Sequence, residues 1–155
     1  MERTGKAKEL WDQAERNYRD DKEEAIAKYS EVIKLLPNDH ESYWSRGNCY
    51  LRSEQLEEAN ADYEKAVSLD PKNGGYYSSL SATYLRLGEN EKASEALEKA
   101  VNLDNKKAGV YYYIFADNIF SSTGNKKEAA VYFKKSVEHG DWDGYAKERL
   151  AEWKM

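Results

Sequence analysis

Apolar residues recur along this chain at intervals of three and four residues, a spacing that predicts amphipathic α-helices rather than the alternation typical of β-strands. A clear example is the series Ala59, Tyr63, Ala66 and Val67. Polar or glycine-containing breaks separate the helical stretches and predict tight turns between antiparallel helices. Three such breaks lie at 52–55, 87–90 and 121–125. The pattern therefore predicts an all-α fold in which short links pack neighbouring helices against each other.

The helical pattern repeats with a period of 34 residues, as in stacked repeat architectures. Pro37 and Pro71 lie 34 residues apart, and Asn105 follows Pro71 at the same interval. Small residues near the start of each second helix give spacings of 34, 34 and 36 along the series Ala25, Ala59, Ala93 and Ala129. The longer last spacing predicts about two inserted residues near Lys106 to Gly109, which leaves the register of the fourth repeat open.

These intervals divide the chain, taken as a single domain over 1–155, into four repeats of two helices each. The repeats are expected at about 8–37, 38–71, 72–107 and 108–141. The tail at 142–155 has an apolar face at helical spacing, and stacks of repeats need a cover for their last apolar face. That face consists of Trp142, Tyr145, Ala146, Leu150 and Trp153. We therefore expect a capping helix, with a weak homodimer contact through Trp153 as the alternative.

Small and aromatic residues, together with a few others, occupy fixed positions in the middle repeats. In the second repeat they are Tyr43, Arg46, Gly47, Tyr50, Ala59, Tyr63, Ala66 and Pro71. In the third they are Tyr77, Leu80, Ser81, Tyr84, Gly88, Ala93, Leu97 and Ala100. Both sets resemble the tetratricopeptide repeat family, whereas the outer repeats are more degenerate, with Asp117 at a position that is normally small. The resemblance implies a right-handed superhelical stack of antiparallel helix pairs, an α-α solenoid.

The resemblance also gives the small residues a steric role. Gly47 and Ala59 are expected where the two helices of the second repeat approach closely, and Tyr50 and Tyr63 are expected to fill the space beside that contact. A leucine at either small position would then overpack the helix pair.

Charge and cysteine content narrow the classes of function. Charged residues make up 34% of the chain and the net charge is -5, so anionic nucleic acids and membrane surfaces are not the expected partners. The single cysteine, Cys49, excludes an internal disulfide. The first ten residues are charged where a secretory signal needs an apolar run, and no stretch has the length of a membrane span. We therefore expect a cytoplasmic protein.

Residues of catalytic type are scattered rather than clustered. His40 and His139 stand alone at the ends of repeats, so no metal site is expected. Cys49 lies inside a predicted helix without a histidine on its face, which favours a packed thiol over a nucleophile. Gly74 and Gly75 form an isolated pair, interpreted as a loose helix start rather than a phosphate-binding loop. The sequence therefore predicts a protein without enzymatic activity, cofactor or metal.

The family resemblance implies that the first helix of each repeat lines a concave groove. The expected binding residues are Trp11, Glu15, Arg19, Trp44, Ser45, Asn48, Arg52, Ser79, Ala82, Arg86, Tyr112, Phe115 and Asn118. Tryptophan and arginine, which recur here at matching places, are frequent interface anchors. The predicted function is that of an adaptor or scaffold that binds a peptide or protein segment. The alternatives are a small chaperone that keeps one client protein soluble, and a structural subunit of a homo-oligomer or larger complex.

One branch of the family binds the C-terminal carboxylate of heat-shock chaperones through lysines and asparagines on successive first helices. The matching positions here are Trp11, Glu15, Ser45, Gly75 and Ser79. No basic residue is among them, and the carboxylate of Glu15 would repel that of the ligand. We therefore expect no carboxylate clamp of this type.

Overall fold

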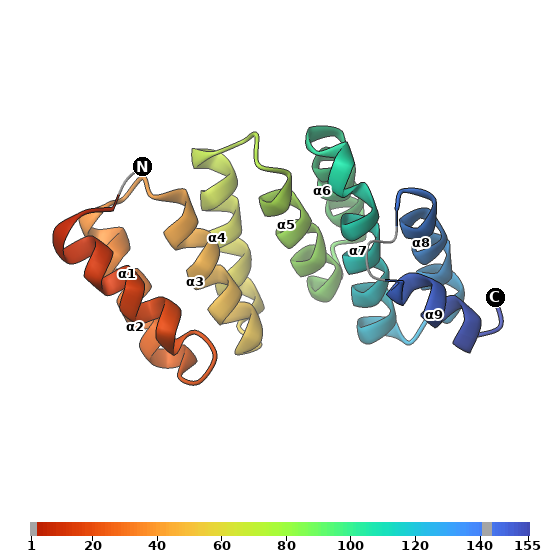
Figure 1. Ribbon diagram of the computed structural model, residues 1–155, viewed down its shortest axis with the longest axis horizontal. Helices are drawn as coiled ribbons and strands as arrows, with labels where there is room; N and C mark the ends of the chain where they lie inside the picture. The colour runs from red at the N-terminus through yellow and green to blue at the C-terminus, as the bar shows by residue number, and fades with distance from the viewer. Residues whose placement is uncertain (1–2, 141–143) are drawn as a thin grey trace. The chain divides into compact units, whose positions relative to one another are not determined.

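The computed structural model of the chain describes residues 3–140 and 144–155, and α-helices dominate this part of the chain (Figure 1). In order they are α1 (Gly5–Asn17), α2 (Lys22–Leu35), α3 (His40–Arg52), α4 (Leu56–Leu69), α5 (Gly74–Leu87), α6 (Asn90–Leu103), α7 (Ala108–Thr123), α8 (Lys126–Glu138) and α9 (Tyr145–Glu152). A short 3-10 helix, η1 (Asn105–Lys107), precedes α7, and the described residues contain no strand. The predicted all-α fold is confirmed.

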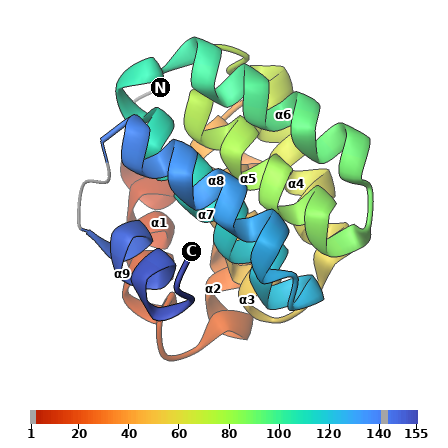
Figure 2. The same ribbon diagram turned by 90° about the vertical axis from the view of Figure 1, so that its right-hand side faces the viewer.

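Backbone contacts divide the chain into two compact units, unit 1 from Met1 to Pro71 and unit 2 from Lys72 to Met155. Each unit contains two antiparallel helix pairs: α1 with α2 and α3 with α4 in unit 1, and α5 with α6 and α7 with α8 in unit 2. Helix α9 packs against α8 at the end of unit 2 (Figure 2). The division coincides with the boundary between the second and third repeats.

Acidic residues lie in the first turn of both second helices of unit 1. Helix α2 has Glu23 and Glu24 in its first turn, and the side chain of Asp21 accepts a hydrogen bond of 2.9 Å from the backbone N–H of Glu24. Helix α4 has Glu57 and Glu58 in its first turn. Negative charge is favourable at this end of a helix because the unpaired N–H groups make it positive. These carboxylates therefore stabilise helix ends.

Gly47 marks the closest approach between α3 and α4. A Cβ atom added to this glycine would lie 2.7 Å from Cε1 and 2.9 Å from Cδ1 of Tyr63, closer than side chains tolerate. Tyr63 and Ala59 on α4 are both fully buried. The steric role that the sequence predicts for these small residues is confirmed at Gly47, where the ring of Tyr63 occupies the space of a side chain.

We expect Gly47→Leu to lower the free energy of unfolding by about 1–3 kcal/mol, because the added side chain must displace the buried ring of Tyr63. Urea unfolding followed by circular dichroism measures the change. The matched control is Ala61→Leu on the exposed side of α4, which should alter stability by no more than about 0.5 kcal/mol. Equal effects of the two substitutions would contradict the close approach.

Gly74 is needed at the start of α5 and does not merely loosen it. A Cβ atom on Gly74 would lie 2.9 Å from the backbone oxygen of Ala100 and 3.0 Å from the hydroxyl of Tyr111. The side chain of Asn73 caps the helix by accepting a hydrogen bond of 3.0 Å from the N–H of Gly75. The interpretation of this pair as a loose helix start is therefore wrong, because one glycine permits a close contact and the other receives a cap.

The insertion in the fourth repeat lies at a different place from the one that the sequence predicts. Four residues separate α4 from α5, at 70–73, and four also separate α6 from α7, at 104–107. Helix α7 has 16 residues, whereas α5 has 14. The two extra residues therefore extend the first helix of the fourth repeat, and the segment around Lys106 and Gly109 has the ordinary length. A helix absorbs such residues without breaking the 3.6-residue pattern, so periodicity alone did not locate them.

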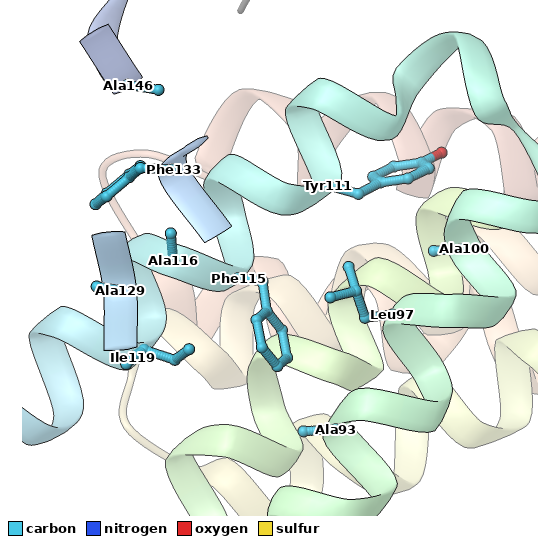
Figure 3. Packing of buried hydrophobic residues seen from close by; sticks show 10 residues of the cluster. All are labelled: Ala93, Leu97, Ala100, Tyr111, Phe115, Ala116, Ile119, Ala129, Phe133 and Ala146. Atoms are coloured by element: carbon cyan, nitrogen blue, oxygen red, sulfur yellow. The ribbon is translucent and has the colours of Figure 1, made fainter. Parts of the chain in front are cut away.

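The core of unit 2 continues into the C-terminal helix. Figure 3 shows Leu97 of α6 and Phe115 of α7 directed toward one another in this core. Trp153 follows α9 and packs on Phe120 at 4.7 Å and on Phe133 at 5.6 Å between ring centroids. Ala146 on α9 is fully buried. Helix α9 therefore covers the end of unit 2, although it begins only at Tyr145.

Two expectations for the tail are affected by this arrangement. Trp153 is half-buried against unit 2 itself, so its ring already has an apolar environment without a second copy of the chain. Trp142, which the sequence assigned to the capping helix, lies outside the described residues. Tyr145 remains 54% exposed, and it is the most accessible aromatic side chain of the described tail.

Candidate functional site

Tyr29 of α2 joins the two first helices of unit 1. Its hydroxyl donates a hydrogen bond to Oε1 of Glu15 on α1, and its ring meets Trp11 edge-on at 5.2 Å between centroids. On its other side it contacts Ser45 and Cys49 of α3. Burial and the bond to Glu15 raise the pKa of Tyr29, so it remains a neutral donor throughout the physiological range. Tyr29 therefore links α2 to side chains of both α1 and α3.

Two matching stripes of side chains run along α1 and α3. Trp11 and Glu15 are four residues apart on α1, and Trp44 and Asn48 are four residues apart on α3, so each pair lies on one helix face. Trp11, Trp44 and Asn48 are half-buried, whereas Glu15 is exposed. We call these four residues the first-helix face of unit 1. They are four of the seven predicted groove residues that lie in unit 1.

A buried tyrosine orients the polar member of each stripe. Tyr63 of α4 donates a hydrogen bond of 2.7 Å to Oδ1 of Asn48, as Tyr29 does to Glu15. Within the described part of the chain, only this hydroxyl bonds to the side chain of Asn48, so its amide nitrogen is directed away from the tyrosine and can donate to a guest. The face therefore presents an acceptor on α1 and a donor on α3, both positioned by the core.

Arg52 has an internal role that the sequence did not reveal. Its guanidinium donates hydrogen bonds to the backbone oxygens of Tyr18 and Arg19, the latter at 3.3 Å, and lies 4.8 Å from the centre of the Tyr18 ring. The last carbonyl groups of a helix lack partners within it, and a cation at this end is favourable. Arg52 therefore fastens the end of α1 to α3, whereas Arg19, at the matching place on α1, has an exposed side chain.

A second network missed by the sequence joins the opposite ends of these helices. The guanidinium of Arg3 lies between the ring of Trp11 and the carboxylates of Asp39 and Glu41. Because Arg3 precedes the helical pattern and Asp39 lies in a turn, neither residue had a periodic signal that could assign it a partner. The first-helix face of unit 1 is thus bounded by an arginine network at each end.

Arg46 and Asp62 form a partly buried ion pair between α3 and α4. The guanidinium donates two hydrogen bonds of 2.7 Å to the carboxylate and a third, of 2.9 Å, to Oγ of Ser30 on α2. The side chains are 19% and 8% exposed. The bonds to Asp62 raise the pKa of Arg46, whereas burial raises the pKa of Asp62 more than Arg46 lowers it. Arg46 belongs to the repeat pattern, but the pattern did not indicate its partner.

Several residues predicted to line the groove are buried or engaged within their own unit. Ser45, Ala82 and Phe115 are only 6%, 6% and 3% exposed, so they offer little surface to a partner. Tyr112 of α7 packs on His139 at 5.3 Å, and Phe115 packs on Tyr132 of α8 at 4.6 Å between centroids. In unit 2 the predicted aromatic anchors therefore contribute to helix packing.

The remaining predicted residues of unit 2 are half-buried, and two of them bond to their own helix. Oγ of Ser79 donates a hydrogen bond of 3.2 Å to the backbone oxygen of Gly75. The side-chain amide of Asn118 donates a hydrogen bond of 2.8 Å to the backbone oxygen of Ile114. Arg86 lies in the last turn of α5. Ala82 stands 34 residues after Asn48, and its methyl group cannot accept a hydrogen bond from a core tyrosine as Asn48 does.

Residues of catalytic type do not cluster in the part of the chain that the structure describes. No three ligand-type side chains lie close enough to bind a metal ion in the described ranges. Cys49 is fully buried, and burial raises its pKa to about 11, which keeps the thiol protonated and unreactive at neutral pH. None of the helices in residues 3–140 and 144–155 is long and apolar enough to cross a membrane.

A hollow in unit 2 lies at the junction of α7 and α9. It encloses about 260 Å³ and is lined by Tyr113, Tyr145, Glu148, Arg149 and Glu152. Arg149 lies 3.5 Å from Glu152, so the charges of its wall partly compensate. The mixture of one cation, two carboxylates and two phenol rings selects no single class of ligand.

Comparison with known proteins gives matches within one repeat family. Residues 40–73 and 75–107 each match the tetratricopeptide repeat. No curated protein sequence matches this chain. Similar solved structures include MamA from Desulfovibrio magneticus RS-1, which is 25% identical with a TM-score of 0.73, over 88% of this chain and 77% of that one.

Two other structures share the fold at lower identity. YrrB, described as a TPR protein with an unusual peptide-binding site, is 22% identical with a TM-score of 0.67, over 94% of this chain and 76% of that one. A protein described as a thermophilic TPR protein in Thermus thermophilus is 20% identical with a TM-score of 0.75, over 94% of this chain and 80% of that one. These likenesses support the helix-pair architecture.

Proposed function

Because this chain is a tetratricopeptide repeat protein, and hence a scaffold for protein–protein interaction, we propose that it binds a segment of another protein against the first-helix face of unit 1. The proposal needs neither a catalytic group nor a cofactor. Trp11 and Trp44 supply apolar contact area, while Glu15 and Asn48 supply one acceptor and one donor at matching places on α1 and α3.

The observation that carries the proposal is the pair of bonds from Tyr29 to Glu15 and from Tyr63 to Asn48. A polar side chain that is already fixed loses less conformational entropy when a partner binds. Stability alone does not require the two bonds, because Leu97 and Phe133, which take the corresponding places in unit 2, are buried without any hydroxyl. The bonds therefore favour a role for unit 1 in recognition.

The chemistry of the face indicates the kind of segment that it binds. An exposed backbone N–H of the guest can donate to Glu15, and a backbone carbonyl can accept from the amide of Asn48. A carboxylate terminus would meet Glu15 and no lysine among the residues of the face, so the segment is bound through its interior rather than through its end. YrrB, with its described peptide-binding site, offers a precedent within the fold.

Trp44→Ala is expected to weaken binding of the partner at least tenfold, about 1.4 kcal/mol, while the thermal midpoint changes little. The tryptophan is half-buried on the face, so its loss removes contact area from the interface. The measurement is affinity capture from the source cell with the wild type and with Trp44→Ala as baits, followed by titration of the captured protein.

The matched control for this experiment is Leu35→Ala at the end of α2, where the side chain is 49% exposed and outside the first-helix face. It should retain the partner at wild-type affinity. A partner that binds Trp44→Ala as tightly as the wild type would place the interface elsewhere. A large fall in the thermal midpoint with unchanged binding would make Trp44 a packing residue.

A further inference from the structure

Arg3 occupies a site made by α1 and the start of α3. Its Nε donates a hydrogen bond of 2.7 Å to Oδ2 of Asp39, and its Nη2 donates to Oδ1 at 3.0 Å. The same Nη2 donates to Oε2 of Glu41 at 2.7 Å. The guanidinium lies over the ring of Trp11, with Cζ 3.4 Å from the ring centre. Only 14% of the Arg3 side chain is exposed.

The carboxylate of Asp39 binds a cation that does not belong to α3. Asp39 is the N-cap residue of α3, yet its side chain makes no capping bond to the helix. It accepts instead from Oγ of Ser42 and from the guanidinium, and its side chain is 3% exposed. A buried carboxylate is costly without a paired cation. The site therefore requires a positively charged group, and Ser42 fixes the orientation of its main acceptor.

The geometry selects a guanidinium over an ammonium group. Two N–H donors meet the two oxygens of Asp39, a third bond goes to Glu41, and the cation lies over the ring of Trp11. A lysine ammonium has no planar fork, so it cannot make the paired bonds and the stacking at the same time. Arginine in such a site can also gain from attraction to the indole ring.

We propose that Trp11, Asp39 and Glu41 form a binding site for an arginine side chain of the partner segment, which Arg3 of this chain fills in the free protein. This inference rests on the proposed function, since Trp11 belongs both to this site and to the first-helix face. Arg3 stands before Thr4, the N-cap residue of α1, so it can leave the site without loss of a helical turn. A partner arginine beside the face would then replace it with the same bonds.

The test uses the full chain, labelled with nitrogen-15, as the wild type and as Arg3→Ala. N-acetyl-arginine amide is titrated into each protein, with the lysine and citrulline analogues in parallel, and the indole signals are followed by NMR. Arg3→Ala should bind the arginine probe at least tenfold more tightly than the wild type does. The lysine probe should bind at least tenfold more weakly than the arginine probe, and the uncharged citrulline probe should produce no saturable shift.

Asp39→Asn in the Arg3→Ala background is the matched control, since it keeps the shape of the side chain and removes its charge. It should abolish the response to arginine. Equal responses to arginine and lysine, or a response that survives Asp39→Asn, would overturn the proposal and leave Arg3 as an anchor of the N-terminal segment.

Should Arg3→Ala fail to fold, Arg3→Lys takes its place, because the lysine keeps the positive charge but not the fork. The arginine probe must then displace the lysine, and an absence of displacement would likewise refute the site. Because the probes are small amides, the result does not depend on the capture experiment. A site that fails here leaves the role of Trp44 open to its own test, and a failed capture leaves this titration valid.

Discussion

Asp62→Ala is expected to lower the free energy of unfolding by about 3 kcal/mol, because it leaves the largely desolvated guanidinium of Arg46, only 19% exposed between α3 and α4, without its carboxylate. The remaining bond, to Oγ of Ser30, is made to a neutral acceptor and does not balance the charge. Urea unfolding measures the loss, and amide hydrogen exchange shows whether it falls on α3 and α4.

The comparison that isolates the charge is the double substitution Arg46→Met with Asp62→Leu. Buried ion pairs can often be replaced by apolar residues of similar volume with little loss, so the double variant should recover most of the stability. Glu64→Ala provides the exposed control on α4 and should cost no more than about 0.5 kcal/mol. A loss in Asp62→Ala no larger than in this control would show that water already screens Arg46.

Periodicity was sufficient to predict the helices and the tight contact within the second repeat. A 34-residue period with small residues at fixed places constrains backbones, because only certain side chains fit where two helices nearly touch, as Gly47 and Tyr63 do. The same reasoning predicted that the last helix covers unit 2, where Trp153 lies on Phe133. These predictions depend on volume and spacing, both of which the sequence contains.

The partners of polar side chains could not be predicted from the sequence in the same way. Arg52 was expected to face a partner, yet it binds the backbone of Tyr18, because periodicity assigns a long side chain to a face without specifying where its end reaches. Arg3 and Asp39 are 36 residues apart and lie outside the apolar pattern. A charged side chain can bind water or an internal partner without changing any apolar position of the sequence. The periodic pattern of apolar residues therefore does not reveal such a partner.

The two units share the repeat architecture but differ in the core residue at one repeat position. In unit 1 a hydroxyl extends from the core to the surface at Tyr29 and Tyr63, and it fixes a polar side chain there. In unit 2 the matching core positions are Leu97 and Phe133, and the aromatic residues of α7 pack inward instead. The repeat therefore sets the backbone frame, and the identity of one core residue decides whether the first helix presents a fixed polar group.

Phe133→Ala is expected to lower the free energy of unfolding by about 3–5 kcal/mol, since its fully buried ring contacts Tyr113 of α7 and Trp153 after α9. The cavity would loosen both neighbours, so hydrogen exchange should accelerate in α7, α8 and α9 together. Val131→Ala is the matched control on α8, because that side chain is 53% exposed and should cost no more than about 0.5 kcal/mol. If α9 kept its protection while α8 lost its own, the C-terminal helix would be stabilised by contacts other than this ring, and its role as the cover of Phe133 would be refuted.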